Sequence, residues 1–178
     1  MTDQRIEVNA AWVRSAVERF EGPLTLYASR MLGDSEAARD VVQDTFLRLC
    51  GQSRETLDGR LAEWRFTVCR NRALDVLRKE SRMTQLSEEQ VLVRTSDDPG
   101  PPDIIERRES TAQVLGLLES LPKNQREVIR LKFQNGFSYQ EIARISGHSV
   151  GNVGYLIHVG LKTIRGQLAD GPPAKAQA

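Results

Sequence analysis

A proline- and glycine-rich segment at residues 97–102 (DDPGPP) constrains the fold of this 178-residue chain more than any other feature. Proline has no backbone N–H, and its ring clashes with the preceding helical turn, so this segment ends any helix that reaches it. Elsewhere, apolar residues recur at the helical spacing of three and four, and no stretch alternates as a strand does. We therefore expect an all-α protein of two small helical domains joined by a flexible linker.

The periodic segments on either side of this break predict the domain boundaries. We expect a first domain at 1–82, an acidic Pro/Gly linker at 83–102, a second domain at 103–168 and a disordered tail at 169–178. These lengths give each domain limited apolar area to bury, so each is expected to be only marginally stable alone.

Three helical segments are predicted in the first domain. The first covers 10–32 as one or two helices, with a break at Gly22 and Pro23. The second covers 36–50, with Ser35 as its cap. The third covers 61–82, and its apolar positions predict that five side chains point toward the core: Leu61, Trp64, Val68, Leu74 and Leu77.

Charge is unevenly distributed, although the net charge is only +1. Residues 60–82 carry seven Lys/Arg and three Asp/Glu, and residues 121–168 carry seven Lys/Arg and two Asp/Glu. Residues 83–110, between them, carry three Lys/Arg and seven Asp/Glu. Two basic regions separated by an acidic one fit two surfaces that touch a polyanion. Solvated helix faces would give the same pattern, so charge alone leaves both interpretations open.

Several classes of protein are not indicated. Cys50 and Cys69 are far apart and have no neighbouring Cys or His ligands, so we expect two small core residues and no metal site. No nucleophile pairs with His148 or His158 in a recognisable motif, and no glycine-rich phosphate loop follows a strand. We expect no enzyme activity, cofactor, small-molecule substrate or membrane insertion, and a cytoplasmic location.

The second half contains the sharpest local pattern. Ser138 and Glu141 predict a capping box for a short helix over 139–146, and Gly147 supplies a tight turn. Ser149 can cap a second helix that runs to about residue 168. Five apolar residues are spaced to pack the two helices together: Ile142, Ala143, Ile145, Val153 and Ile157. This pattern predicts a helix-turn-helix whose second helix can enter the DNA major groove, and a plain helical hairpin is the alternative.

Longer motifs add specificity to this pattern. Residues 121–129 (LPKNQREVI) and 136–143 (GFSYQEIA) resemble region four of sigma-70 family factors. Residues 32–49 resemble region 2.2, and residues 64–78 (WRFTVCRNRALDVLR) resemble regions 2.3 and 2.4. The resemblance covers nearly the whole chain, in the family's order, and is strongest to the extracytoplasmic-function group. It implies a transcription initiation factor that binds core RNA polymerase and promoter DNA, and an inhibitory anti-sigma factor as a further partner.

The resemblance also assigns roles to particular residues. On the helix over 36–50, it implies that five residues bind polymerase: Asp40, Gln43, Asp44, Phe46 and Leu47. The same helix is predicted to bury Ala38, Val42, Thr45, Phe46 and Leu49 on its opposite face. On the long helix, Asn71 is implied to hold a flipped base of the minus-ten element. Five basic residues can lie along the phosphate backbone: Arg70, Arg72, Arg78, Lys79 and Arg82.

The predicted recognition helix departs from the family. Relatives usually carry several Arg or Lys residues in the span between Val153 and Lys162, and this chain has none there. The residues left to contact the minus-thirty-five element are Ser149, Asn152, Tyr155, Leu156, His158 and Lys162. Burial of Leu156, Val159 and Leu161 against a neighbouring helix or partner is an alternative. Two other functions remain open, a helix-turn-helix regulator acting without polymerase and a protein-interaction module.

Overall fold

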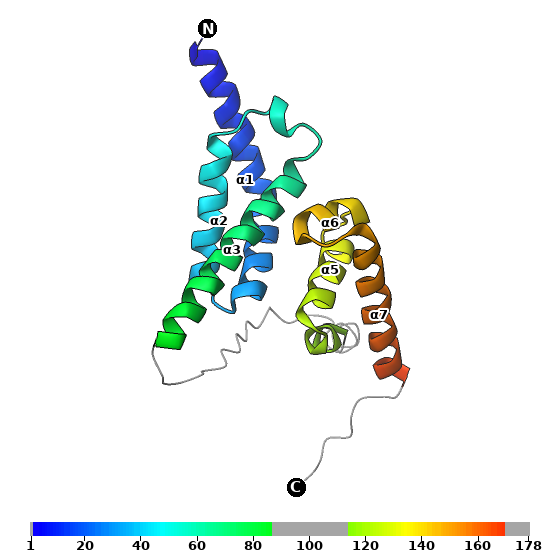
Figure 1. Ribbon diagram of the computed structural model, residues 1–178. Helices are drawn as coiled ribbons and strands as arrows, with labels where there is room; N and C mark the ends of the chain where they lie inside the picture. Colours follow the sequence, from blue (N-terminus) through cyan, green and yellow to red (C-terminus); the bar gives the residue numbers. More distant parts are fainter. Residues whose placement is uncertain (1, 87–113, 170–178) are drawn as a thin grey trace, which may run out of the picture. The chain divides into compact units, whose positions relative to one another are not determined.

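The computed structural model describes residues 2–86 and 114–169, and every regular element in these two ranges is helical (Figure 1). The chain divides into two compact domains, an N-terminal domain of residues 1–98 and a C-terminal domain of residues 99–178. Most of the expected linker and nearly all of the expected tail lie outside the described residues. No helix in the described ranges is long and apolar enough to cross a membrane.

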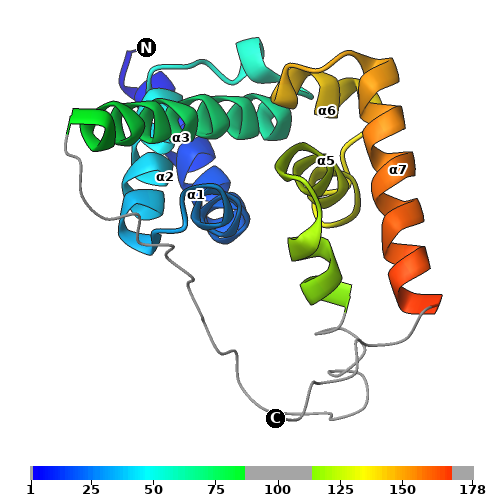
Figure 2. The same ribbon diagram turned by 60° about the horizontal axis from the view of Figure 1, so that its bottom comes forward.

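Three long helices form the N-terminal domain: α1 (Thr2–Leu32), α2 (Ser35–Cys50) and α3 (Leu61–Leu86). Each packs against the other two, and a 3₁₀ turn, η1 (Glu55–Leu57), lies between α2 and α3 in the chain (Figures 1 and 2). The long helix α3 continues four residues beyond the predicted end at residue 82.

Of the two alternatives for residues 10–32, the single helix is confirmed, without the expected break, whereas the predicted cap of α2 is wrong. Helix α1 is continuous through Pro23, although a proline inside a helix costs about 3 kcal/mol. Buried side chains on both sides of the proline, Ala16 before it and Leu24 and Ala28 after it, hold the helix together. Asp34, rather than Ser35, caps α2, because its Oδ1 accepts the backbone N–H of Glu36 at 2.8 Å and that of Ala37 at 3.2 Å.

The core-facing side of α3 also differs from the prediction. Leu61, Trp64, Val68, Leu74 and Leu77 are all half-buried. The stripe that enters the core consists of Arg65, Phe66, Cys69 and Ala73, each of them at most 1% exposed. The prediction followed the apolar residues alone and did not include Arg65.

Arg65 is fully buried where α3 packs on α1. Its guanidinium carbon lies 3.3 Å from the centroid of the Phe20 ring. Its Nε donates to the Leu61 carbonyl at 3.1 Å and its Nη1 to the Ala16 carbonyl at 3.4 Å, while Nη2 is buried without a hydrogen-bond partner. Burial, and then the neighbouring Arg19 guanidinium, lower the pKa of Arg65 to about 9, so the side chain is charged at neutral pH.

The two cysteines differ in exposure, which corrects the expectation that both belong to the core. Cys50 is exposed at the end of α2, whereas Cys69 is buried in α3. Burial raises the pKa of the Cys69 thiol to about 12, against the opposing effect of its hydrogen bond with Thr45. Because the thiolate is the reactive form, Cys69 should be inert while the domain is folded.

We therefore expect a thiol reagent such as Ellman's reagent to modify one cysteine quickly at pH 8, and the other only after unfolding in urea. In the variant Cys50→Ser the fast reaction should disappear, and in Cys69→Ala it should remain. Two equally fast reactions in the folded wild-type protein would contradict the buried position of Cys69.

The C-terminal domain contains a helical segment over 114–120, then α5 (Lys123–Phe133), α6 (Tyr139–Ser146) and α7 (Val150–Ala169). Helix α7 packs along α5 and contacts α6, and α5 also contacts α6 (Figures 1 and 2). Glu119, in the first segment, forms ion pairs with Arg126 and Arg130 of α5.

Candidate protein and nucleic-acid interfaces

Helix α2 has one buried face and one exposed face. Its buried residues are Ala38, Val41, Val42, Thr45, Phe46 and Leu49. On the opposite face Asp40, Gln43 and Leu47 are exposed, and Leu47 exposes 63% of its surface. A single exposed leucine is common on protein surfaces, so the candidate interface is the whole face, with its carboxylate and amide beside Leu47. We call Asp40, Gln43 and Leu47 the α2 face.

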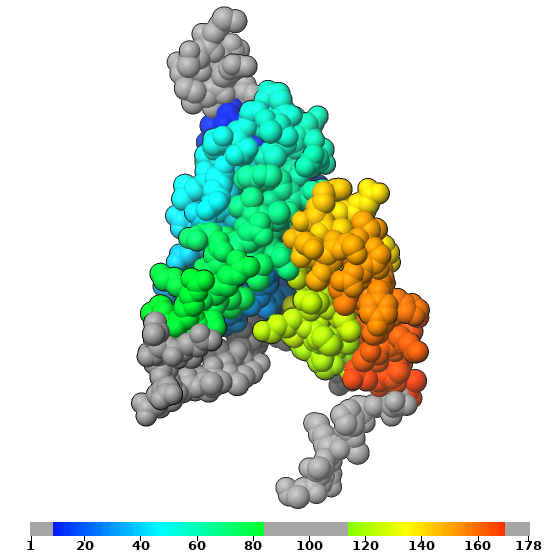
Figure 3. Space-filling view, in the orientation of Figure 1, coloured from blue at the N-terminus to red at the C-terminus, as the bar shows by residue number. Residues whose placement is uncertain are grey.

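Two other residues predicted to bind polymerase lie differently. Phe46 is only 8% exposed and packs in the domain core, so it supports the helix and is not part of the α2 face. Asp44 lies at the edge of that face, where its Oδ2 accepts Arg48 Nε at 3.0 Å and Arg72 Nε at 2.9 Å. One carboxylate thereby connects α2 to α3, whose surfaces adjoin on one side of the domain (Figure 3).

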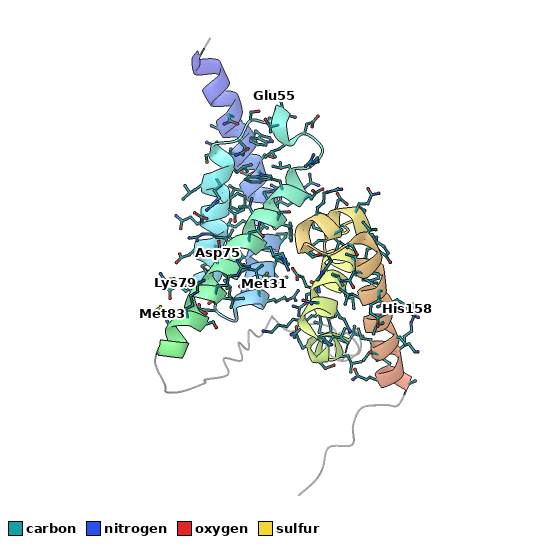
Figure 4. The ribbon with its side chains drawn as sticks, in the orientation of Figure 1. Met31, Glu55, Asp75, Lys79, Met83 and His158 are labelled. Atoms are coloured by element: carbon teal, nitrogen blue, oxygen red, sulfur yellow. The ribbon has the colours of Figure 1, made fainter. Side chains whose placement is uncertain are left out.

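Helix α3 displays most of its predicted DNA-binding residues. Asn71, Arg78, Lys79 and Arg82 are exposed, whereas Arg70 and Arg72 are half-buried. Arg78 Nη1 donates to Asp75 Oδ1 at 3.3 Å, an exposed pair that leaves the remaining guanidinium nitrogens accessible. Asp75, Lys79 and Met83 follow one another along one edge of the helix, at successive turns (Figure 4).

Trp64 lies on the same side of α3 as Asn71. The two residues are seven positions apart, almost two full turns, so their side chains leave the helix within about 20° of each other. Trp64 is half-buried rather than part of the core. The sequence favours a core position for Trp64, with stacking on an unpaired base as the alternative, and the partly exposed ring is compatible with stacking.

The helix-turn-helix forms as the cap residues predict. The Ser138 N–H donates to Glu141 Oε2 at 2.7 Å, and the Glu141 N–H donates to Ser138 Oγ at 3.3 Å, which completes the capping box. Ser138 Oγ also donates to Glu141 Oε2 at 2.6 Å, and this hydrogen bond, followed by that from the Ser138 N–H, lowers the pKa of Glu141. Gly147 ends α6 with a φ of 75°, and the Asn152 N–H donates to Ser149 Oγ at 3.2 Å at the start of α7.

The predicted packing between the two helices is also present. Ile142, Ile145, Val153 and Ile157 are buried, and Ala143 is half-buried. Gly160 is buried where α7 crosses α5, and a Cβ atom there would lie only 2.6 Å from Ile129 Cδ1. The glycine therefore allows the close packing of α7 on α5, and a side chain at this position would require Ile129 to move.

The residues predicted to contact DNA from α7 fall into two groups. Asn152, Tyr155, His158 and Lys162 are exposed, with Tyr155 at 64%, and His158 points away from the domain (Figure 4). Ser149 is also exposed, but its hydroxyl serves as the cap. Three residues are half-buried: Leu156, Val159 and Leu161. They are neither fully available to DNA nor fully buried against a neighbouring helix.

Comparisons with known proteins match both domains. The family description "Sigma-70 region 2" matches residues 16–83, and "Sigma-70, region 4" matches residues 111–164. The ECF RNA polymerase sigma factor SigE of Mycolicibacterium smegmatis is 31% identical over 153 residues, which are 85% of this chain and 59% of that protein. SigL of Mycobacterium tuberculosis is 30% identical over 163 residues, which are 88% of each chain.

Two solved structures share the fold. The sigma factor RpoE of Bartonella quintana, in complex with the anti-sigma factor NepR, superposes with a TM-score of 0.70 at 22% identity, over 89% of this chain and 98% of that one. CnrH, in complex with the cytosolic domain of CnrY, gives a TM-score of 0.62 at 24% identity and covers 96% of both chains.

The two helical domains and the helix-turn-helix define a DNA-binding transcription factor. The matches to both conserved regions, in order, are more specific. The chain belongs to the sigma-70 family of RNA polymerase sigma factors, in the extracytoplasmic-function group.

Proposed function

We propose that the chain binds core RNA polymerase through the α2 face and directs it to promoters through α3 and the helix-turn-helix. The observation that carries this proposal is that all three surfaces occur in one chain. A DNA-binding regulator that acts without polymerase needs only the helix-turn-helix, and would assign no role to the α2 face or to the basic residues of α3. An interaction module would need neither Asn71 nor the exposed arginines of α3.

In this proposal the two domains contribute different contacts. Arg78, Lys79 and Arg82 neutralise phosphates and position the DNA, while Asn71 reads a base of the opened minus-ten element. The helix-turn-helix holds the upstream element. The chain needs no catalytic group for these roles, and we expect it to act in the cytoplasm, where core polymerase transcribes.

We also expect a protein inhibitor. The RpoE and CnrH structures each hold a second protein, and that of RpoE is named as an anti-sigma factor. Such a partner would cover the surfaces that polymerase and DNA require. Competition between core polymerase and a candidate inhibitor for the full chain would test this expectation.

Run-off transcription tests the proposed function. Purified core polymerase should produce defined transcripts from a library of genomic promoter fragments only when the chain is added. Core polymerase alone controls for non-specific initiation. DNA binding by the chain without any gain in specific transcription would instead favour the regulator, and no effect on either would favour the interaction module.

Asn71 provides a residue-level prediction. Asn71→Ala should cost about 1–3 kcal/mol of binding at a single minus-ten position, the usual range for one base contact. Quantitative run-off assays on promoters with each base substituted would locate that position. Ser81→Ala, on another exposed side of α3, is the control and should change nothing. An equal loss on every substituted promoter would indicate a backbone or structural role for Asn71.

A further inference from the structure

The start of α7 carries no charged side chain on its exposed side. From Val150 to Leu161 the helix contains no Asp, Glu, Lys or Arg, and the first charge is on Lys162. At 100° per residue, Gly151, Gly154, Tyr155 and His158 fall within one 100° sector, opposite the buried residues Val153 and Gly160. The part of α7 that would meet base edges is therefore neutral and partly aromatic.

A second aromatic ring from α6 adjoins this sector. A Cβ atom at Gly154 would lie 3.6 Å from Cε2 of Tyr139, which is ordinary van der Waals contact, so the ring lies against the α7 backbone. Tyr139 is 40% exposed, and Lys132 Nζ lies 5.4 Å from its ring centroid. Lys132 Nζ also donates to the Phe137 carbonyl at 3.3 Å, which fixes the ammonium group beside the ring.

Gly151 has no role in the internal packing of the domain. A Cβ atom there would meet nothing within 4 Å. Gly151 is the second residue of α7, and no contact within the domain requires a glycine there. A glycine that faces outward lets another molecule approach the helix backbone closely.

The residue types on the exposed side of α7 favour some base pairs over others in the major groove. Guanine is usually read by Arg or Lys, which donate to its O6 and N7, and the start of α7 has neither. Thymine presents a C5-methyl group to apolar side chains, and adenine presents a donor and an acceptor that an Asn amide matches. The 64% exposed Tyr155 can contact the methyl group, and the exposed Asn152, which leaves the helix about 60° from Tyr155 at the border of this sector, can pair with adenine.

We propose that α7 selects A·T base pairs in the upstream promoter element, with Tyr155 against a thymine methyl group and Asn152 on an adenine, and does not read guanine. This inference rests on the proposed function, because it requires holoenzyme bound at a promoter. It assigns the thymine contact to Tyr155, since Leu156 is half-buried.

Modified bases test the inference directly. Holoenzyme made with the full chain is used first to select upstream elements from a randomised library. In a selected promoter, deoxyuridine then replaces each upstream thymidine in turn, which removes only the C5-methyl group. In parallel, 7-deazaguanine replaces each upstream guanine, which removes the N7 acceptor. We expect a several-fold loss of holoenzyme binding at one or two deoxyuridine positions, and no loss with 7-deazaguanine.

Two variants separate base reading from general affinity. Tyr155→Ser should abolish the sensitivity to deoxyuridine, and it should still support transcription from a template with a pre-melted minus-ten element. Lys162→Gln is the control: it should weaken binding to every upstream sequence alike and retain the sensitivity to deoxyuridine.

Three outcomes would overturn the inference. The first is a loss with 7-deazaguanine but none with deoxyuridine. The second is unselective use of upstream sequences while minus-ten-dependent transcription is intact, which would make this face of α7 a protein interface. The third is no transcription with core polymerase from any template, which would overturn the proposed function itself.

Discussion

Asp40→Arg and Gln43→Arg should each weaken binding of the chain to core RNA polymerase by about tenfold or more while leaving the fold unchanged. Both side chains are exposed on α2, so neither substitution disturbs the core. The α2 face pairs a carboxylate and an amide with the exposed Leu47, a combination that suits a basic partner surface. A new positive charge there would face like charges as the complex forms, and like-charge contacts cost affinity.

Titration of labelled core polymerase measures this effect, and circular dichroism verifies the fold. Gln167→Arg makes the same chemical change as Gln43→Arg, at an exposed position near the end of α7. This variant should bind core polymerase like the wild type. Folded Asp40→Arg and Gln43→Arg proteins that both bind with wild-type affinity would show that polymerase docks elsewhere.

Arg65→Met should raise the free energy of unfolding of the N-terminal domain by about 1–4 kcal/mol, the range seen when apolar side chains replace buried ionic groups. No carboxylate pairs with Arg65 among the described residues, and its Nη2 has no hydrogen-bond partner. Removing such a charge from water costs several kcal/mol. The stacking on Phe20, worth roughly 2 kcal/mol, and the two hydrogen bonds to carbonyls offset part of this cost, but Nη2 stays unsatisfied, so we expect the cost to exceed the gain.

Urea unfolding followed by tryptophan fluorescence measures this prediction in the full chain. Both tryptophans, Trp12 and Trp64, belong to the N-terminal domain, so the signal reports on that domain alone. Arg60→Met, at an exposed arginine just before α3, is the control and should change stability by less than about 0.5 kcal/mol. A fall in stability for Arg65→Met would mean that the contacts of the guanidinium outweigh its desolvation.

The helix-turn-helix could be predicted because its limits are encoded locally. Ser138, Glu141, Gly147 and Ser149 each act on backbone groups within four residues, so their effect does not depend on the rest of the fold. The exposed α2 face could be predicted for a related reason. Its polar residues recur at helical spacing on the side opposite a strongly apolar stripe.

The errors arose where distant contacts decide the structure. Helical periodicity predicted that the apolar side of α3 faces the core. In the structure, Phe20 and the Ala16 carbonyl of α1 contact the Arg65 guanidinium and stabilise it in the core. The same burial against neighbouring helices keeps α1 intact through Pro23. No local rule contains that information, because the stabilising partners lie elsewhere in the chain.

Gly160, on the inner side of α7, affects the position of the outward face of the same helix. Its missing side chain leaves room for Ile129 and Leu121, and the outward residues Tyr155 and Lys162 lie on the opposite side of the helix. A larger residue at 160 would displace the Ile129 side chain or, if the side chains around it hold it in place, move α7 away from α5 together with its outward face. Binding residues must be held within about 0.5 Å of their productive positions. The packing on the inner side of α7 therefore affects how its outer side can contact DNA.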